Sequence, residues 1–116
     1  MEAISTYIER QSTTQQEILH YLYDYFMSFP NISVKKRYGI PFYDQKTWVC
    51  YTNAHKKGGV ELVFLKGREL SEYPTLEANG RKMVKGILYK EVTDINLEIL
   101  DPLWMEALAL DMMKKK

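Results

Sequence analysis

The sequence predicts an α+β domain, in which an antiparallel sheet of four or five strands carries helices from both ends of the chain on one face. Helical patterns of apolar residues occupy residues 4–29 and 95–113. Between them lie short runs rich in Val, Tyr and Phe, most of them joined by links of hairpin length. Helices and strands therefore occupy separate parts of the chain, which is typical of α+β rather than alternating α/β folds.

The composition is that of one globular domain, spanning residues 1–116. Apolar residues make up 46% and charged residues 27%, enough to bury a core without disulfide or metal staples. The net charge is +1 with both signs interleaved, which argues against nucleic-acid binding through bulk charge. The single cysteine, Cys50, fits a reducing compartment. Without a signal-peptide pattern or an apolar run of roughly 20 residues, we expect a cytoplasmic protein that does not bind membranes.

A short amphipathic turn or helix and then a longer helix are expected before the first strand. Ile4, Tyr7 and Ile8 have the spacing of an amphipathic turn. Thr14 and Glu17 have the spacing of a capping box, which predicts that a longer helix starts at Thr14. The apolar stripe of this longer helix consists of Ile18, Leu22, Tyr25, Phe26 and Phe29.

Four strands and a last helix follow. The strands are expected at residues 33–38, 47–53, 60–66 and 83–90, with a long surface loop at 68–80. Asp101 and Pro102 resemble an N-cap followed by proline at the first helical position, which predicts the start of the last helix. Trp104 of this helix is expected to pack on the same sheet face as Phe26.

The middle strands lack a polar face. If residues 47–53 form a regular strand, Trp48 and Cys50 point to one face and Val49 and Tyr51 to the other. A sheet with water on one side alternates apolar and polar residues, and this one does not. The helices can cover only one face, so the second face needs a cover: the long loop, a ligand or a second subunit in a homodimer.

The most distinctive stretch is residues 35–43, Lys-Lys-Arg-Tyr-Gly-Ile-Pro-Phe-Tyr. Pro41 fixes its own φ, and Gly39 can take a positive φ. We therefore expect an extended chain through Tyr38, a bend at Gly39, and a second extended arm through Tyr43. The favoured interpretation is a sheet corner packed with aromatic rings, and the alternative is one wall of a binding cleft.

In the cleft interpretation a small apolar or aromatic ligand lies at this corner. Since Trp48 and Tyr51 of a regular strand point to opposite faces, at most one of them belongs to the cavity, and Trp48 is preferred. The candidate ligand-binding residues are Tyr38, Gly39, Pro41, Tyr43 and Trp48.

Residues 38–43, Tyr-Gly-Ile-Pro-Phe-Tyr, resemble the aromatic-Gly-X-Pro-X-Tyr signature of the bacterial YdhG-like family, a domain of unknown function. Residues 64–67 with the following Leu70, and residues 80–82 before an apolar strand, resemble later parts of that family. The similarity runs from about residue 7 to residue 113, although Tyr38 stands where the family usually has Trp. The resemblance implies an α+β domain with an antiparallel sheet. Some members are described as frataxin-like iron chaperones.

Glu17, His20 and Asp24 lie at positions i, i+3 and i+7, on the side of the long helix away from its apolar stripe. Two carboxylates and an imidazole on one helix face suit Fe(II) or another divalent ion. The favoured interpretation is an ordinary solvated face. Frataxin-type iron handling relies on an acidic surface, and this nearly neutral chain departs from it.

Positive evidence for catalysis is missing from the sequence. Cys50 is expected to be a buried, inert thiol, and residues 55–59, His-Lys-Lys-Gly-Gly, a solvated hairpin tip rather than an anion-binding loop. We recognise no catalytic triad, dinucleotide-binding fingerprint or metalloprotease helix, so an enzyme is not expected. The first hypothesis is a non-catalytic binding module with a small-ligand pocket on one sheet face. The alternatives are a divalent-metal, iron-type chaperone and a homodimerising structural domain.

Overall fold

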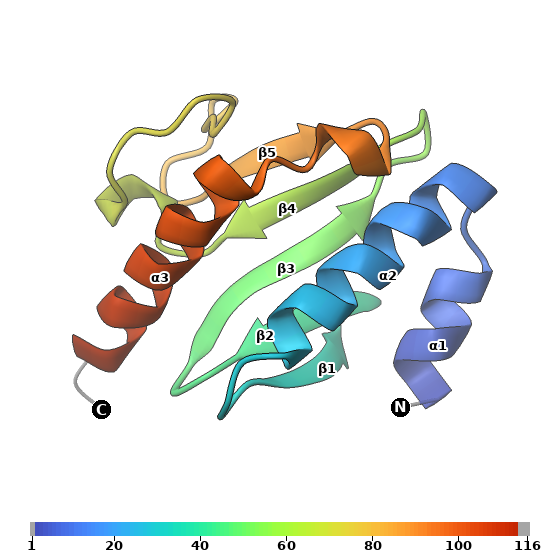
Figure 1. Cartoon of the computed structure of the whole chain (residues 1–116), viewed down its shortest axis with the longest axis horizontal. Coiled ribbons are helices and arrows are strands. Elements are labelled where there is room, and N and C mark those ends of the chain that lie inside the picture. The colour runs from blue at the N-terminus through green and yellow to red at the C-terminus, as the bar shows by residue number, and fades with distance from the viewer. Residues whose placement is uncertain (1, 114–116) are drawn as a thin grey trace.

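The computed structural model describes residues 2–113 and contains one five-stranded sheet with three α-helices (Figure 1). The strand order is β1-β2-β3-β4-β5, and each strand is antiparallel to the next. The α+β prediction is confirmed. In chain order the elements are α1 (Glu2–Glu9), α2 (Thr13–Met27), β1 (Ser33–Arg37), β2 (Ile40–Asp44), β3 (Trp48–Ala54), β4 (Val60–Phe64), β5 (Lys85–Tyr89) and α3 (Leu97–Met113).

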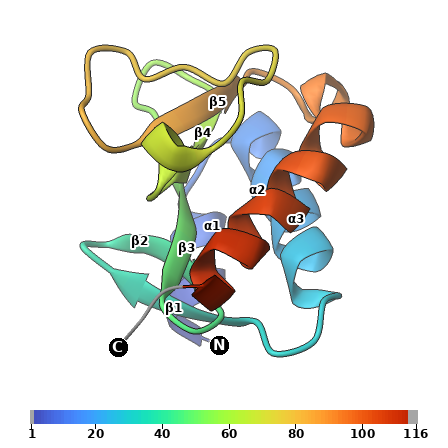
Figure 2. The same ribbon diagram turned by 90° about the vertical axis from the view of Figure 1, so that its left-hand side faces the viewer.

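All three helices lie on one face of the sheet, which we call the helix face (Figures 1 and 2). The opposite side of the sheet is called the open face. The segment that joins β4 to β5 packs first against α3, where Ser71 and Tyr73 donate to Glu106, and then crosses to the open face, where Arg81 donates to Glu61 (Figure 2). This segment includes a short 3-10 turn, Gly67–Glu69. No helix in residues 2–113 has the length and apolar character needed to cross a membrane.

The core lies between the helices and the helix face of the sheet. Trp104 of α3 and Phe26 of α2 are fully buried there, with ring centroids 4.4 Å apart. Tyr43 of β2 packs 4.7 Å from Phe26. The two helices therefore share one sheet face, as the apolar stripes predicted.

The start of α2 differs from the prediction. Ser12, not Thr14, is the N-cap: its Oγ accepts a hydrogen bond from the Gln15 N–H, and the Gln15 side chain accepts from the Ser12 N–H, both at 3.2 Å. Gln15 is buried and also donates through Nε2 to the carbonyls of His55 and Gly59, at 2.8 and 2.9 Å. Because this tertiary contact fixes Gln15, the capping box forms with the serine three residues before it.

The start of α3 also lies earlier than predicted. The helix begins at Leu97, where the Asn96 side chain accepts a hydrogen bond from the Glu98 N–H at 2.9 Å. Pro102 is thus inside the helix rather than at its first position. Asp101 accepts a hydrogen bond from the Tyr25 hydroxyl at 2.5 Å, so its carboxylate ties α3 to α2 instead of capping a helix.

Candidate functional site

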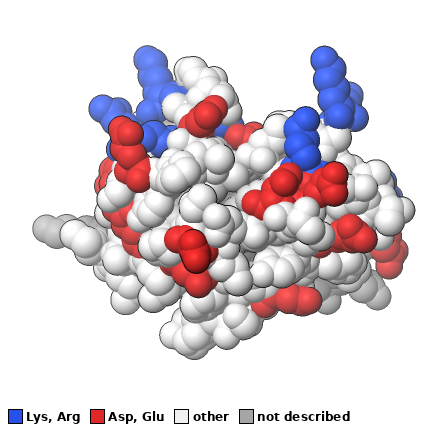
Figure 3. All heavy atoms as spheres, turned by 45° about the horizontal axis from the view of Figure 1, so that its top comes forward, with Lys and Arg blue, Asp and Glu red and all other residues white. Residues whose placement is uncertain are grey.

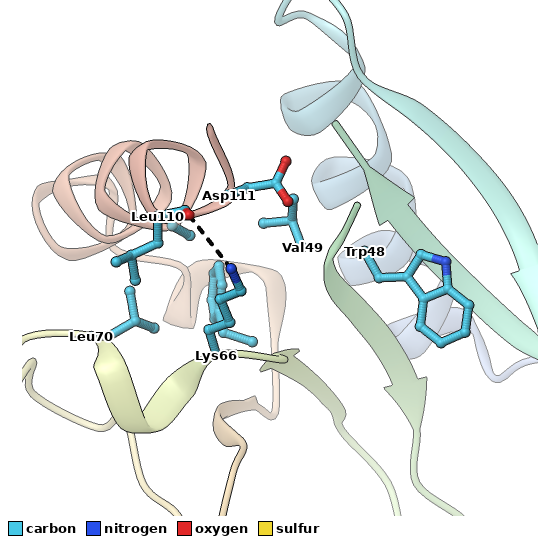
Figure 4. Close-up of a pocket in the computed structure, with 8 residues that line it drawn as sticks. Trp48, Val49, Lys66, Leu70, Leu110 and Asp111 are labelled. Carbon is cyan, nitrogen blue, oxygen red and sulfur yellow. Dashed lines mark hydrogen bonds between the residues drawn. The ribbon is translucent and has the colours of Figure 1, made fainter. Parts of the chain in front are cut away.

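A β-bulge in β3 decides which side chains reach the open face. Tyr43 of β2 lies opposite Cys50, but the next residue, Asp44, lies opposite Trp48, so Val49 is the extra residue. Such a bulge breaks the alternation of side chains along a strand. Val49 and Cys50 are buried in the core on the helix face, while Trp48 is 40% exposed. Figure 4 shows Val49 pointing toward α3 and Trp48 pointing away from it.

The bulge overturns the predicted orientation of these residues. Trp48 does not share a face with Cys50, and it does share one with Tyr51, because both pack against Phe42 of β2. The ring centroid of Phe42 lies 5.2 Å from that of Trp48 and 4.9 Å from that of Tyr51. Both therefore belong to the candidate site, whereas a regular strand allowed only one of them.

The hairpin that joins β1 to β2 brings a further aromatic ring to this face. Its two turn residues, Tyr38 and Gly39, have φ of 54° and 79°. A two-residue turn with both φ values positive matches the twist of its flanking strands. The prediction of an extended backbone at Tyr38 is therefore wrong. The residue is left-handed, a conformation that costs a residue other than glycine about 1 kcal/mol. Its ring is 82% exposed and lies 5.8 Å from Phe42 and 6.3 Å from Trp48.

Pro41 and Tyr43 do not line this site, contrary to the prediction. Both occupy alternate positions of β2 whose side chains face the helices, and both are buried. Tyr43 is 1% exposed, and burial raises the pKa of its phenol well above the usual range. The intervening Phe42 faces the open side instead, since neighbouring strand residues alternate. Gly39 shapes the turn without lining the site: a Cβ there would meet nothing within 4 Å.

The four rings of Tyr38, Phe42, Trp48 and Tyr51, here called the aromatic cluster, surround an open hollow of about 370 Å³. We call it the aromatic hollow. Its other lining residues are Ile40, Asn53 and Leu65. Burial raises the pKa of Tyr51, with a smaller opposing effect of Arg81, so this phenol stays protonated and can donate a hydrogen bond.

A second hollow, of about 570 Å³, adjoins the first and is lined by both cations and carboxylates. We call it the charged hollow. Trp48 and Leu65 line both hollows and form their common border. The other residues of the charged hollow are Arg37, Asp44, Lys46, Thr47, Lys66, Glu69 and Met83.

Arg37 is fixed at this border. Its two terminal nitrogens donate to the two carboxylate oxygens of Asp44, at 3.0 and 2.9 Å. The guanidinium carbon lies 4.6 Å from the ring centroid of Trp48 and 6.0 Å from that of Phe42. A paired and stacked guanidinium is more ordered than an exposed lysine, so Arg37 offers a positive charge in a defined place.

The later part of the segment between β4 and β5 crosses the open face beside these two strands. Arg81 of this segment donates to Glu61 of β4 at 2.7 Å, and Glu77 exchanges two backbone hydrogen bonds of 2.9 Å with Gly86. A Cβ at Gly86 would lie 2.4 Å from a carboxylate oxygen of Glu61, so a larger residue there would displace the Glu61 side chain. The loop thus covers the part of the open face near β4 and β5. The aromatic cluster lies on the part that the loop does not cover.

A buried carboxylate holds the turn that precedes Trp48. Asp111 of α3 is 2% exposed and accepts hydrogen bonds from the Lys46 N–H at 2.6 Å and the Thr47 N–H at 3.0 Å. The Thr47 hydroxyl and the Gln45 amide also donate to it. Burial alone raises the pKa of Asp111, but these hydrogen bonds outweigh it and lower the pKa below the usual value. The end of α3 therefore positions the start of β3.

The predicted metal ligands Glu17, His20 and Asp24 are all exposed on α2. The described part of the chain contains no group of three or more His, Cys, Asp or Glu side chains that could hold a metal ion. The structure does not gather the three into a site. His20 instead borders a small hollow of about 90 Å³, together with Ile4 and Ile8 of α1.

Neither the charges on the face drawn in Figure 3 nor Cys50 adds a candidate site among the described residues. On the face drawn in Figure 3, basic side chains project in separate groups along the upper edge, with acidic side chains below them, as the mixed composition predicts. Cys50 is fully buried, and burial raises the pKa of its thiol well above the usual value. A thiol of this kind stays protonated and unreactive, as expected from the sequence.

Comparisons with known proteins found no match to any family model, curated protein or solved structure. The resemblance to the YdhG-like family therefore stays a prediction, and the candidate site rests on its own geometry.

Proposed function

We propose that the protein is a non-catalytic binding module that holds a small apolar or aromatic ligand in the aromatic hollow. The carrying observation is the bulge at Val49, which gathers Trp48 and Tyr51 on the open face beside Phe42 and Tyr38. Two of these rings, Tyr38 and Trp48, are exposed to water, which is costly for large apolar groups, so a site that uses them is the simplest reason for the arrangement. We place this module in the cytoplasm, since a single buried thiol suits a reducing compartment.

The size and chemistry of the hollow suit such a ligand. Its volume of about 370 Å³ lies in the range of small-molecule sites, roughly 300–1,000 Å³. The rings can stack on a flat molecule, and the Tyr51 hydroxyl and the Asn53 amide can fix its orientation. The strained, exposed Tyr38 supports the same conclusion, because backbone strain of this kind concentrates at functional sites.

Binding rather than catalysis fits the titratable groups. The carboxylates with lowered pKa values, Asp111 and Glu106, accept hydrogen bonds from turn and loop residues and support the fold. In the aromatic hollow the shifted group is Tyr51, whose raised pKa keeps it neutral. A neutral phenol serves as a hydrogen-bond donor, not as a base.

The test replaces Tyr38 with Asn, which tolerates the left-handed turn but removes the ring. A thermal-shift screen with flat aromatic and fatty compounds should give hits for the wild type, and Tyr38→Asn should weaken their affinity about five- to tenfold. Without ligand, the melting temperature of Tyr38→Asn should equal that of the wild type or be slightly higher. Tyr21→Ala, at an exposed tyrosine of α2 outside the hollow, is the matched control. The proposal fails if no compound stabilises the wild type and Tyr38→Asn melts like a core variant.

A further inference from the structure

The two hollows meet at Trp48 and Leu65, so a ligand that fills one extends naturally into the other. We infer that the ligand is a planar aromatic molecule that carries an acidic group, a carboxylate or a phosphate. Its ring lies in the aromatic hollow and its anion in the charged hollow. This inference rests on the proposed function and adds the charge of the ligand to it.

The charge balance of the second hollow supports an anion. Three cations line it, Arg37, Lys46 and Lys66, against two carboxylates, Asp44 and Glu69. Asp44 already accepts both hydrogen bonds of the bidentate pair with Arg37, and its side chain is only 13% exposed. Glu69 is exposed to water on the 3-10 turn. Within the bidentate pair the charges of Arg37 and Asp44 cancel each other, so the excess of three cations over two carboxylates leaves the lining with a formal net charge of +1.

Arg37 places positive charge at the distance that such a ligand requires. Its guanidinium carbon is 6.0 Å from the ring centroid of Phe42, which floors the aromatic hollow. Two of its five N–H donors are used by Asp44, and arginine binds carboxylates and phosphates through the donors that remain. An acidic group attached one or two atoms from a stacked ring therefore comes within reach of Arg37.

Lys66, which also lines the charged hollow, provides the second contact. Figure 4 shows its side chain directed to the carbonyl of Leu110 near the end of α3, and the Nζ to oxygen distance is 3.5 Å. This distance is at the limit for a hydrogen bond, so little is lost when the ammonium turns to an anion. Lys66 is half-buried at the edge of the charged hollow.

The experiment uses three probes with the same ring and a similar tail: indole-3-acetate, indole-3-acetamide and tryptamine, which are anionic, neutral and cationic. Calorimetric titration of the whole protein should rank them in that order. The acetate should bind about fivefold more tightly than the amide, as expected of an ion pair that stays in contact with water. This advantage should shrink at about 0.5 M salt, where charges are screened beyond a few ångströms.

Lys66→Gln should remove most of the preference for the acetate, so that the acetate and the amide bind with nearly the same affinity. Lys56→Gln makes the same change of charge on the exposed turn between β3 and β4, outside both hollows, and should keep the preference. Adenosine and its 5′-monophosphate form a second pair. In each pair the acidic compound is compared with the neutral one. A larger gain in affinity from adenosine to its monophosphate assigns phosphate as the anion, and a larger gain from the indole amide to the acetate assigns carboxylate.

Two results separate the inference from the proposed function. If the amide binds as tightly as the acetate, or tryptamine binds best, the inference that the ligand is acidic fails. The proposal that the aromatic hollow binds a ligand is then kept. If none of the probes binds, both the inference and the proposed function fall.

Discussion

Asp111 shows how one side chain supports the site from a distance. It lies on α3, yet it accepts hydrogen bonds from three consecutive residues of the β2–β3 turn, Gln45, Lys46 and Thr47. That turn leads directly into Trp48. The sequence did not reveal this role, because the two partners are separated by more than sixty residues. Local patterns did not identify the true N-cap Ser12 or the left-handed Tyr38 either, since tertiary contacts and strand twist decided both.

The lowered pKa of Asp111 makes the stability of the protein depend on acid. The pKa in the folded state is below that of the unfolded chain, so the carboxylate stabilises the fold above the unfolded value, about 3.8. That contribution is lost as pH falls through the folded pKa. We expect Asp111→Asn to lower the free energy of unfolding by about 2–3 kcal/mol at neutral pH.

Denaturant unfolding between about pH 2 and pH 6 measures this dependence. The difference in the free energy of unfolding between Asp111→Asn and the wild type should become smaller as the pH is lowered. Asp24→Asn, on the exposed face of α2, removes one carboxylate without touching the turn and serves as the control. Equal losses in the two variants would mean that Asp111 does not hold the turn.

At the scale of elements, the bulge in β3 determines the site. Sequence reasoning located β3 to within one residue at each end but assigned the faces of Trp48 and Val49 wrongly, because it applied a regular alternation. A bulge adds a single residue and leaves no periodic signal. The alternation of Phe42 and Tyr43 in β2 was available from the sequence. Alternation shows that these two side chains point to opposite faces, but it does not show which of them points to the helices. In the structure Tyr43 does.

Paired substitutions test the bulge. Val49→Asn places an amide in the core against α3 and should cost about 3 kcal/mol, from lost packing and an unpaired polar group. Trp48→Asn removes a half-exposed ring and should cost about 1 kcal/mol. Urea denaturation compares them. A larger loss of stability for Trp48→Asn than for Val49→Asn would indicate a regular strand with Trp48 in the core. The aromatic cluster would then not exist.

For the whole molecule, the sequence predicted the architecture well, because it follows from coarse features. The separated helical and β-rich segments indicated α+β, and the apolar stripes placed Trp104 and Phe26 on one face. The lack of a polar face led us to expect a cover on the second side of the sheet, and the loop that carries Arg81 covers part of that side. What covers each half could not be predicted, since it depends on the path of the residues between β4 and β5.

The shared core gives a test of this architecture. Trp104 is fully buried, and its Nε1–H has no hydrogen-bond partner among the described residues. Trp104→Ala should lower the free energy of unfolding by about 3–5 kcal/mol, as a large core truncation does. Trp104→Phe keeps most of the ring and removes the unpaired N–H, so its cost should be below about 1.5 kcal/mol. An unchanged unfolding midpoint for Trp104→Ala would place this residue at the surface.

Trp104→Phe also leaves Trp48 as the single tryptophan, which makes the central claim measurable. The most direct test is a titration of that variant with 1-anilinonaphthalene-8-sulfonate, an aromatic anion that accepts excitation energy from tryptophan. If the aromatic hollow binds such molecules, Trp48 emission should fall along a saturable curve as probe emission rises, and adding Tyr38→Asn should weaken the apparent affinity about five- to tenfold. A linear, non-saturating response, or the same curve with and without the Tyr38 ring, would contradict the assignment of this face as a ligand site.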